Sequence, residues 1–331
     1  STRPLATVND DVVDKAAQGS TQQVNVLAND VSPFPGEPLE LVGTPAVEQG
    51  QGTATLSGSN VSVTPAADFV GTMVVRYRVA DATGDADREV DGRIRVTVQG
   101  RPAAPATPQV TEVRSKTIVL SWSPPAANGA PITGYTVSGG GITRECAATT
   151  CTIDGLRNNA EYSFTVTATN EVGTSDPSPA SASARPDERP SAPGAPVATF
   201  GDRQLQLTWA APTGYEGSPV ESYTLEISPA PPSGSAQTSV NGTSHTWTGL
   251  ANGTAYQVRV QAHNRADSPS DWSGYGGETP AGVPGTPGQP QVSGLNPVGN
   301  QNQVEVSWAA ADRNGADVTG YTLAVMQGGS T

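Results

Sequence analysis

The sequence predicts an all-β chain of tandem β-sandwich domains in a rod-like arrangement. Three observations predict this class: apolar and polar residues alternate along short segments, three Trp residues recur at domain-sized intervals, and turn formers are abundant, with 37 Gly and 29 Pro in 331 residues. Successive side chains of a strand point to opposite faces, so alternation indicates strands with one buried face. No comparably long segment has the helical period, which leaves short strands joined by tight turns.

The Trp residues mark an internal repeat. They lie 87 and 99 residues apart, which matches the size of a small β-sandwich. Each is followed 13 or 14 residues later by a Tyr, and the pairs are Trp122 with Tyr135, Trp209 with Tyr223, and Trp308 with Tyr321. Apolar residues of one parity precede each Trp, at Ile118 and Leu120, Leu205 and Leu207, and Val304 and Val306. We expect each set to line the buried face of a strand.

These residues resemble fibronectin type III domains. The Trp of the second strand, the Tyr of the third and a Leu-then-Tyr corner before the sixth are present, the corners being Leu156 with Tyr162 and Leu250 with Tyr256. The resemblance implies that the corner Tyr hydrogen-bonds to nearby backbone. It implies domains at 101–189 and 190–281 and the N-terminal part of an incomplete third domain at 282–331. We expect the Pro-rich stretches 101–108, 185–196 and 279–290 to act as stiff linkers.

Residues 1–100 form a different module. Alternating strands are expected around Val24, Val61, Val75 and Val96, and the sequence words that accompany them are Asn9-Asp10-Asp11, Leu27-Ala28-Asn29-Asp30, Phe69-Val70-Gly71 and Val79-Ala80-Asp81. This pattern is similar to the cadherin-like, Ig-like repeats (tandem-95 type) of bacterial surface proteins. With fibronectin units after it, the chain resembles the large membrane-anchored Ig-like and fibronectin repeat proteins of high-GC Gram-positive bacteria. The resemblance implies an extracellular position at the bacterial cell surface, on a membrane- or wall-anchored parent protein.

Calcium is the cofactor that residues 1–100 suggest. In a sandwich, the start of the first strand and two interstrand loops meet at one pole, and here they carry acidic and amide side chains. The six candidate ligands are Asp10, Asp11, Asn29, Asp30, Asp81 and Asp85. Calcium takes six to eight hard oxygens, which carboxylates and Asn carbonyls supply. The alternative is that these residues serve turns and solvated loops, because the loop after Asp30 lacks the acids that related repeats often carry there.

The chain has two Cys residues, Cys146 and Cys151, which flank four residues between two strand-like segments. We expect a disulfide that bridges a hairpin and stabilises it by about 2 kcal/mol on the chain-entropy model. A redox or metal pair is the alternative, but the spacing is not C-x-x-C and no His is near. A structural disulfide predicts an oxidising, extracytoplasmic compartment.

Aromatic residues suggest a ligand surface in the second fibronectin unit. Tyr215 follows the second strand, and Trp272 and Tyr275 follow the sixth, so the three rings are expected at one pole as a platform for a sugar or a protein. The alternative is partial burial against Pro-rich loops. The two His residues, His245 and His263, have no partnering Cys. Neither the G-x-S-x-G motif of a catalytic triad nor the H-E-x-x-H motif of a zinc site occurs, so we expect no enzyme activity.

Composition excludes several classes of function. The 31 Asp and Glu residues exceed the 18 Lys and Arg residues, giving a net charge of −13, which disfavours nucleic acid as a partner. No apolar run reaches the ~18 residues of a membrane span. We therefore expect a non-catalytic extracellular stalk segment that spaces or presents other domains, with a cell-wall protein or glycan as a partner. The alternatives are the accessory region of a secreted polysaccharide-degrading enzyme and an adhesin.

Overall fold

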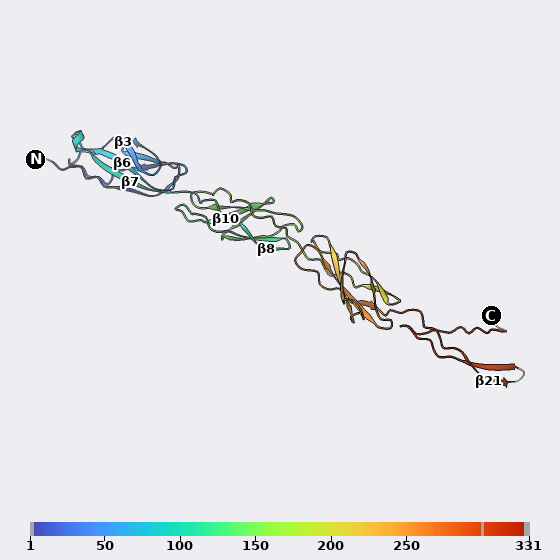
Figure 1. Cartoon of the computed structure of the whole chain (residues 1–331). Coiled ribbons are helices and arrows are strands. Elements are labelled where there is room, and N and C mark those ends of the chain that lie inside the picture. The colour runs from blue at the N-terminus through green and yellow to red at the C-terminus, as the bar shows by residue number, and fades with distance from the viewer. Residues whose placement is uncertain (1–2, 299–300, 328–331) are drawn as a thin grey trace. The chain divides into compact units, whose positions relative to one another are not determined.

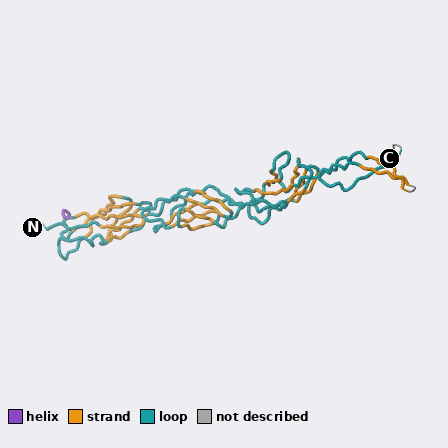
Figure 2. Tube along the Cα trace, turned by 90° about the horizontal axis from the view of Figure 1, so that it is seen from below, coloured by secondary structure: helices purple, strands orange, loops and turns teal. Residues whose placement is uncertain are grey.

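The computed structural model describes residues 3–298 and 301–327, and strands carry nearly all of its regular structure. The helical segment of this part of the chain is a single 3-10 turn, Ala86–Arg88, drawn in purple in Figure 2. The chain forms two compact units, one ending at Arg185 and the other beginning at Pro186, except that 114–116 and 157–159 group with the second. The all-β class with separate sheets in tandem is confirmed.

The first domain is a sandwich of two sheets. A four-stranded sheet has the order β1-β7-β6-β3, with β1 parallel to β7, and β3, β6 and β7 lie together in Figure 1. A three-stranded sheet has the order β2-β5-β4. The strands are β1 Asp11–Ala17, β2 Gln22–Val24, β3 Glu40–Gln49, β4 Gly52–Ser57, β5 Asn60–Pro65, β6 Gly71–Ala80 and β7 Val90–Gln99. Between the sheets lie Val61, Val75 and Val96, each fully buried, as the alternation predicts.

The second domain also pairs two sheets, β12-β9-β8 and β11-β10-β13. Its strands are β8 Gln109–Arg114, β9 Thr117–Ser121, β10 Gly134–Gly139, β11 Ile142–Cys146, β12 Thr150–Ile153 and β13 Thr165–Thr169. Ile118, Leu120 and Val166 are fully buried between the sheets. The residues at the alternate strand positions that the sequence predicts as buried therefore form the core of this domain.

The third domain repeats this arrangement with sheets β14-β15-β18 and β17-β16-β19-β20. Its strands are β14 Val197–Gly201, β15 Gln204–Thr208, β16 Ser222–Ser228, β17 Gln237–Val240, β18 Ser244–Thr248, β19 Tyr256–His263 and β20 Gly276–Glu278. The corner Tyr hydrogen-bonds to backbone as expected, because Ala251 N–H donates to the Tyr256 hydroxyl over 3.0 Å.

Each predicted Trp and Tyr pair forms an edge-to-face contact. Ring centroids are 5.3 Å apart for Trp122 and Tyr135, 5.5 Å for Trp209 and Tyr223, and 5.4 Å for Trp308 and Tyr321. This geometry is favourable for aromatic pairs, since the ring edge is positive and the face negative. The pair thus recurs in all three repeats that carry the Trp.

After residue 281 the described chain contributes one two-stranded sheet, β21 Gln291–Val298 with β22 Gln301–Ser307. The apolar positions Val292 and Val304 are 68% and 52% exposed, unlike their counterparts in the earlier domains. Burial of such a face requires a second sheet, and none packs on it among the described residues.

The last segment of each fibronectin sandwich runs along the sixth strand with a three-residue period. In the third domain, Ser270 pairs with Ala262 and Ser273 with Val260, each through two bonds: the Ser N–H donates to the strand carbonyl, and the Ser Oγ accepts from the strand N–H. In the second domain, Ser175, Ser178 and Ser181 pair in the same way with Ala168, Val166 and Phe164. Positions between these Ser residues therefore face away from the strand.

Candidate functional site

The acidic residues at the start of the first domain converge in part. Asn9 N–H donates to Asp30 Oδ1 over 2.8 Å, and Tyr77 Oη–H donates to Asp11 Oδ2 over 2.9 Å. Asn29 Nδ2 donates to the Asp10 carbonyl over 3.4 Å. The second Asp30 oxygen, Oδ2, is buried and has no hydrogen-bond partner. An orphaned carboxylate oxygen at such a place fits an additional donor or a cation.

The surroundings of Asp11 and Asp30 favour the protonated form of each carboxyl. Burial raises the pKa of Asp11, and the nearby Asp30 and Asp10 carboxylates raise it further. Burial also raises the pKa of Asp30. Like charges near one another disfavour ionisation, so a bound cation or a proton would relieve the repulsion.

Two of the six predicted calcium ligands have protein partners instead. Arg88 Nε donates to Asp81 Oδ2 over 2.8 Å, and the Thr83 hydroxyl donates to Asp81 Oδ1 over 2.5 Å. The Arg88 bond, followed by the Thr83 bond, lowers the pKa of Asp81 to about 2. Asp85 Oδ1 accepts from Asp87 N–H and begins the 3-10 turn. Both Asp81 oxygens are engaged and Asp85 caps the turn through Oδ1, so we carry Asp10, Asp11, Asn29 and Asp30 forward as the candidate set.

Four candidate side chains are few for calcium, which takes six to eight oxygen ligands. Across the described residues, no three Asp, Glu, His or Cys side chains are grouped as a metal site requires. Asp11 and Asp30 would supply carboxylate oxygens, and Asn29 an amide oxygen. Further oxygens would have to come from backbone carbonyls or solvent. Calcium therefore stays a prediction, with these residues as its ligands.

The disulfide is present. Cys146 at the end of β11 is bonded to Cys151 in β12, and the two Cα atoms are 5.9 Å apart. Both side chains belong to the core cluster of the second domain, which indicates a structural role.

The three predicted platform residues have different contacts. The Tyr215 hydroxyl donates to the Ser218 carbonyl over 3.0 Å, so that ring is held within its own loop. Trp272 and Tyr275 instead share one cation: the Arg259 guanidinium lies 4.5 Å from the Trp272 ring centroid and 5.5 Å from that of Tyr275. Trp272 and Tyr275 thus form one surface feature through Arg259, while the hydrogen bond of Tyr215 lies within its own loop.

The His residues have structural contacts. His263 Nε2 lies 2.8 Å from the Thr224 hydroxyl, and His245 packs edge-on against Trp247 at a centroid distance of 5.6 Å. Burial lowers the pKa of His245, which favours its neutral form. His263 and Thr224 lie on the paired strands β19 and β16, so their contact links these two strands.

A junction that sequence reasoning missed joins the first and second domains. Gly100 N–H donates to the Asn128 carbonyl and Asn170 Nδ2 donates to the Gly100 carbonyl, both over 2.8 Å. Gln99 Nε2 donates to the Gly129 carbonyl over 2.7 Å. A Cβ on Gly100 would lie 2.1 Å from Gln18 Oε1, so the linker is packed against the first domain as well.

A similar junction follows the third domain. Gly253 N–H donates to the Pro280 carbonyl over 2.9 Å, and Gly282 N–H donates to the Asn314 carbonyl over 3.0 Å. Asn252 Nδ2 bridges the two sides, because it donates to Asp202 Oδ1 over 2.7 Å and to Asn314 Oδ1 over 2.8 Å. The sequence feature that could have predicted these junctions is the Asn-Gly pair that recurs at Asn128 and Asn314, six residues after Trp122 and Trp308.

The Pro-rich stretches are hydrogen-bonded to the domains that follow them. Ala103 N–H donates to Ala126 O, Gly194 N–H to Ala210 O, and Gly285 N–H to Asp312 O. At least one residue of each stretch is therefore bonded to the domain that follows. Pro excludes regular pairing at its own position but leaves its neighbours free to donate.

Comparison with known proteins agrees with this architecture. The family described as "Fibronectin type III domain" matches residues 103–184 and 191–274, together about half of the chain, and "Bacterial Ig domain" matches 2–97. In the described part of the chain, no helix has the length and apolarity that crossing a membrane would take.

Relatives include receptors and one enzyme. Human Roundabout homolog 3 is 30% identical over 62% of this chain, and human Netrin receptor DCC is 30% identical over 67%. Chitinase A1 of Niallia circulans is 29% identical over 56% of the chain. The chain spans 17%, 16% and 27% of these three proteins, respectively.

Proposed function

This chain belongs to the fibronectin type III family, and on that premise we propose that it is a non-catalytic extracellular segment that holds other domains at a distance from a bacterial cell surface. The observation that supports this role most is the bonding of the junctions. Backbone groups of residues 99–101 and 280–283 donate to or accept from the loops beside them. A linker whose polar groups are engaged samples fewer orientations than a free coil.

The surface suits a spacer. The net charge of −13 and the presence of only two Lys residues keep the chain soluble and limit attraction to anionic polymers. The disulfide and the bacterial Ig domain are consistent with a position outside a bacterial cell. Surface proteins or glycans are the partners that such a position would offer.

The stiffness of the first junction can be measured in the full chain. Spin labels can be attached at two exposed positions, Ser57→Cys in the first domain and Thr143→Cys in the second. Pulsed electron paramagnetic resonance then reports the distance between the two labels. We expect a single narrow distance distribution. Asn170→Ala should broaden it, because Asn170 holds the Gly100 carbonyl.

Lys15→Ala is the matched control. Its ammonium lies 3.8 Å from Glu171 across the same junction, but both side chains are more than half exposed, so the pair contributes little. A broad distribution in the unsubstituted chain would refute the spacer role. Equal broadening by the two variants would refute the role of Asn170.

The accessory region of a secreted polysaccharide-degrading enzyme is the second candidate. The similarity to Chitinase A1 favours it. The open reading frame that encodes the chain distinguishes the two: a glycoside hydrolase domain in that frame supports the accessory role, whereas further sandwich domains and an anchor support the spacer.

We also propose that the first domain binds calcium through Asp11, Asn29 and Asp30, on the strength of the orphaned Asp30 Oδ2 and the two raised carboxylate pKa values. Millimolar calcium should raise the melting temperature of the first domain within the full chain, and Asp30→Ala should abolish the rise. Asp81→Asn should retain it, since Asp81 is paired with Arg88. An unchanged melting curve would exclude the metal.

A further inference from the structure

We propose that the third domain, residues 190–281, binds a neutral polysaccharide on the outward face of its sheet β17-β16-β19-β20, with Tyr275 and Gln257 as the principal contact residues. This goes beyond the spacing role, which requires no ligand. The site combines an outward aromatic pair, a fixed cation between the rings, and a shallow cavity beside Tyr275.

The backbone directs the two rings outward. Ser270 and Ser273 are buried and bonded to β19, and Gly276 continues their three-residue period by pairing with Val258. Trp272 and Tyr275, themselves three residues apart, therefore share a direction away from that bonding. Tyr275 is 52% exposed, which is high for a ring of its size.

Arg259 fixes the rings in place. Its side chain leaves the outward side of β19 and lies over both rings, at 4.5 Å from the Trp272 centroid and 5.5 Å from the Tyr275 centroid. Glu226 on the neighbouring strand accepts from Arg259 Nε over 2.8 Å and neutralises its charge. An aromatic surface that is already ordered loses little entropy when a ligand binds.

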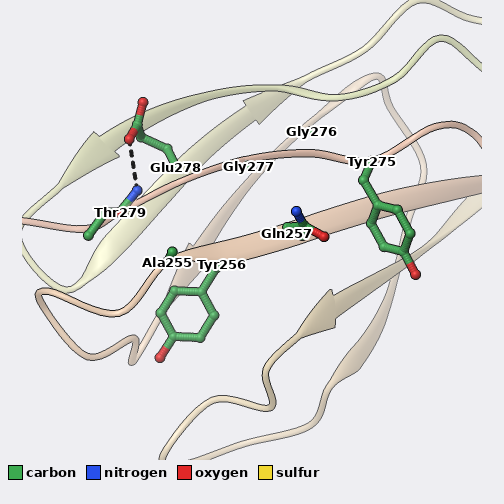
Figure 3. Close-up of a pocket in the computed structure, with 8 residues that line it drawn as sticks. All are labelled: Ala255, Tyr256, Gln257, Tyr275, Gly276, Gly277, Glu278 and Thr279. Carbon is green, nitrogen blue, oxygen red and sulfur yellow. Dashed lines mark hydrogen bonds between the residues drawn. The ribbon is translucent and has the colours of Figure 1, made fainter.

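The cavity beside Tyr275 has a volume of about 240 Å³ and is open to solvent. Figure 3 shows Tyr275 and Gln257 at one end, and Glu278 with Thr279 at the other. Gly276 and Gly277 form the strand between these ends. A side chain on Gly277 would meet the Tyr256 carbonyl at 2.0 Å, so this stretch of the cavity stays clear.

The chemistry of these groups fits a sugar. The negative face of a Tyr ring attracts the C–H groups of a pyranose, while the Gln257 amide and the Glu278 carboxylate can bond hydroxyl groups. A neutral glycan is favoured over an anionic one, because Glu226 already pairs with Arg259 and Glu278 would repel a negative ligand. We therefore assign the ligand to neutral polysaccharide chains of hexose or N-acetylhexosamine.

The fold itself does not require this arrangement. The second domain has the same bonding of its last segment to β13, yet Pro177 and Ala180 stand where the third domain has Trp272 and Tyr275. By the same alignment, Thr165 occupies the position of Arg259. The second domain thus lacks the aromatic pair and its cation, which favours a role in binding over one in folding.

Affinity electrophoresis of the full chain tests the proposal. Native gels contain hydroxyethyl cellulose or glycol chitin, and parallel pull-downs use crystalline cellulose, crystalline chitin and purified peptidoglycan. We expect retardation or capture by at least one of the cellulose and chitin probes. Capture by peptidoglycan alone would contradict the proposal, because peptidoglycan carries carboxylates and is anionic.

Variants locate the site. Tyr275→Ala should weaken binding at least tenfold, and Arg259→Gln at least threefold, with circular dichroism verifying that each variant is folded. Phe200→Ala is the matched control, since Phe200 is 55% exposed on the other sheet of the same domain, and it should bind as the unsubstituted chain does.

Two results would overturn the proposal: no interaction with any of the four cellulose and chitin probes, or an equal loss in Phe200→Ala and Tyr275→Ala. Either result leaves the spacer role standing, because the distance measurement across residues 99–101 does not involve this domain. A broad distance distribution would conversely remove the spacer role and leave the glycan site intact.

Discussion

Asn170 should contribute more to stability than any exposed charge near it. It is 4% exposed, and its Nδ2 lies 2.8 Å from the Gly100 carbonyl, 3.1 Å from that of Ala127 and 3.3 Å from that of Ala130. Its Oδ1 accepts from the N–H groups of Val172 and Gly173. Asn170→Ala removes every one of these bonds at a site that solvent reaches poorly.

The magnitude follows from the groups left unpaired. Leaving a buried polar group without a partner costs about 1–3 kcal/mol. Gly100 and Ala130 are buried, so at least two carbonyls lose this donor, and we expect a loss of about 3 kcal/mol in the free energy of unfolding. At roughly 4–8 °C per kcal/mol for a domain of this size, the melting temperature should fall by more than about 10 °C.

Differential scanning calorimetry of the full chain measures the fall. Glu171→Ala is the control, because Glu171 adjoins Asn170 but is exposed, and its transition should move by no more than about 0.5 kcal/mol in equivalent stability. A shift in Asn170→Ala no larger than that of Glu171→Ala would show that the reasoning about buried carbonyls is wrong.

Three further predictions concern the disulfide and the acidic residues. Replacing both Cys146 and Cys151 by Ser should lower the free energy of unfolding of the second domain by about 2 kcal/mol in a urea titration, and an unchanged midpoint would contradict this. Because the pKa of Asp30 is raised in the folded state, ionisation destabilises the first domain as pH rises above about 4. Asp30→Asn should therefore raise its melting temperature at pH 7, measured without calcium, while leaving that at pH 3 nearly unchanged. Asp81 has the opposite sign: its pKa is lowered to about 2, so its contribution is present above about 4 and is lost as pH falls towards 2. Asp81→Asn should lower the melting temperature at pH 7 and make the melting temperature less dependent on pH in the acid range. An equal loss of melting temperature at pH 7 and at pH 3 would refute the role of the Asp81 charge.

Local patterns in the sequence predicted the cores well. Alternation selects which side chains face inward, and Ile118, Leu120 and Leu205 are fully buried at the expected parity. The regular spacing of the Trp and Tyr residues marked each pair, although in the second and third domains the two residues come from consecutive strands that lie in opposite sheets. The disulfide required only a short separation between Cys146 and Cys151.

The local sequence did not indicate which polar and aromatic side chains find partners in the folded chain. Asp30 and Asp81 look alike in the sequence, but Arg88 pairs with Asp81, while Asp30 Oδ2 is left without a partner. Tyr215 and Tyr275 also look alike as loop aromatics, and only the folded chain places Arg259 over Tyr275.

The sequence by itself determined the class of fold, the repeat and the buried faces, because these depend on the period of apolar residues along the chain. The tertiary structure decided which carboxylates are paired, how Gly100 is held, and which rings form a surface. Those outcomes depend on hydrogen bonds and ring contacts between residues far apart in sequence, such as Asn170 with Gly100. Their distance and direction are set only once the strands have packed.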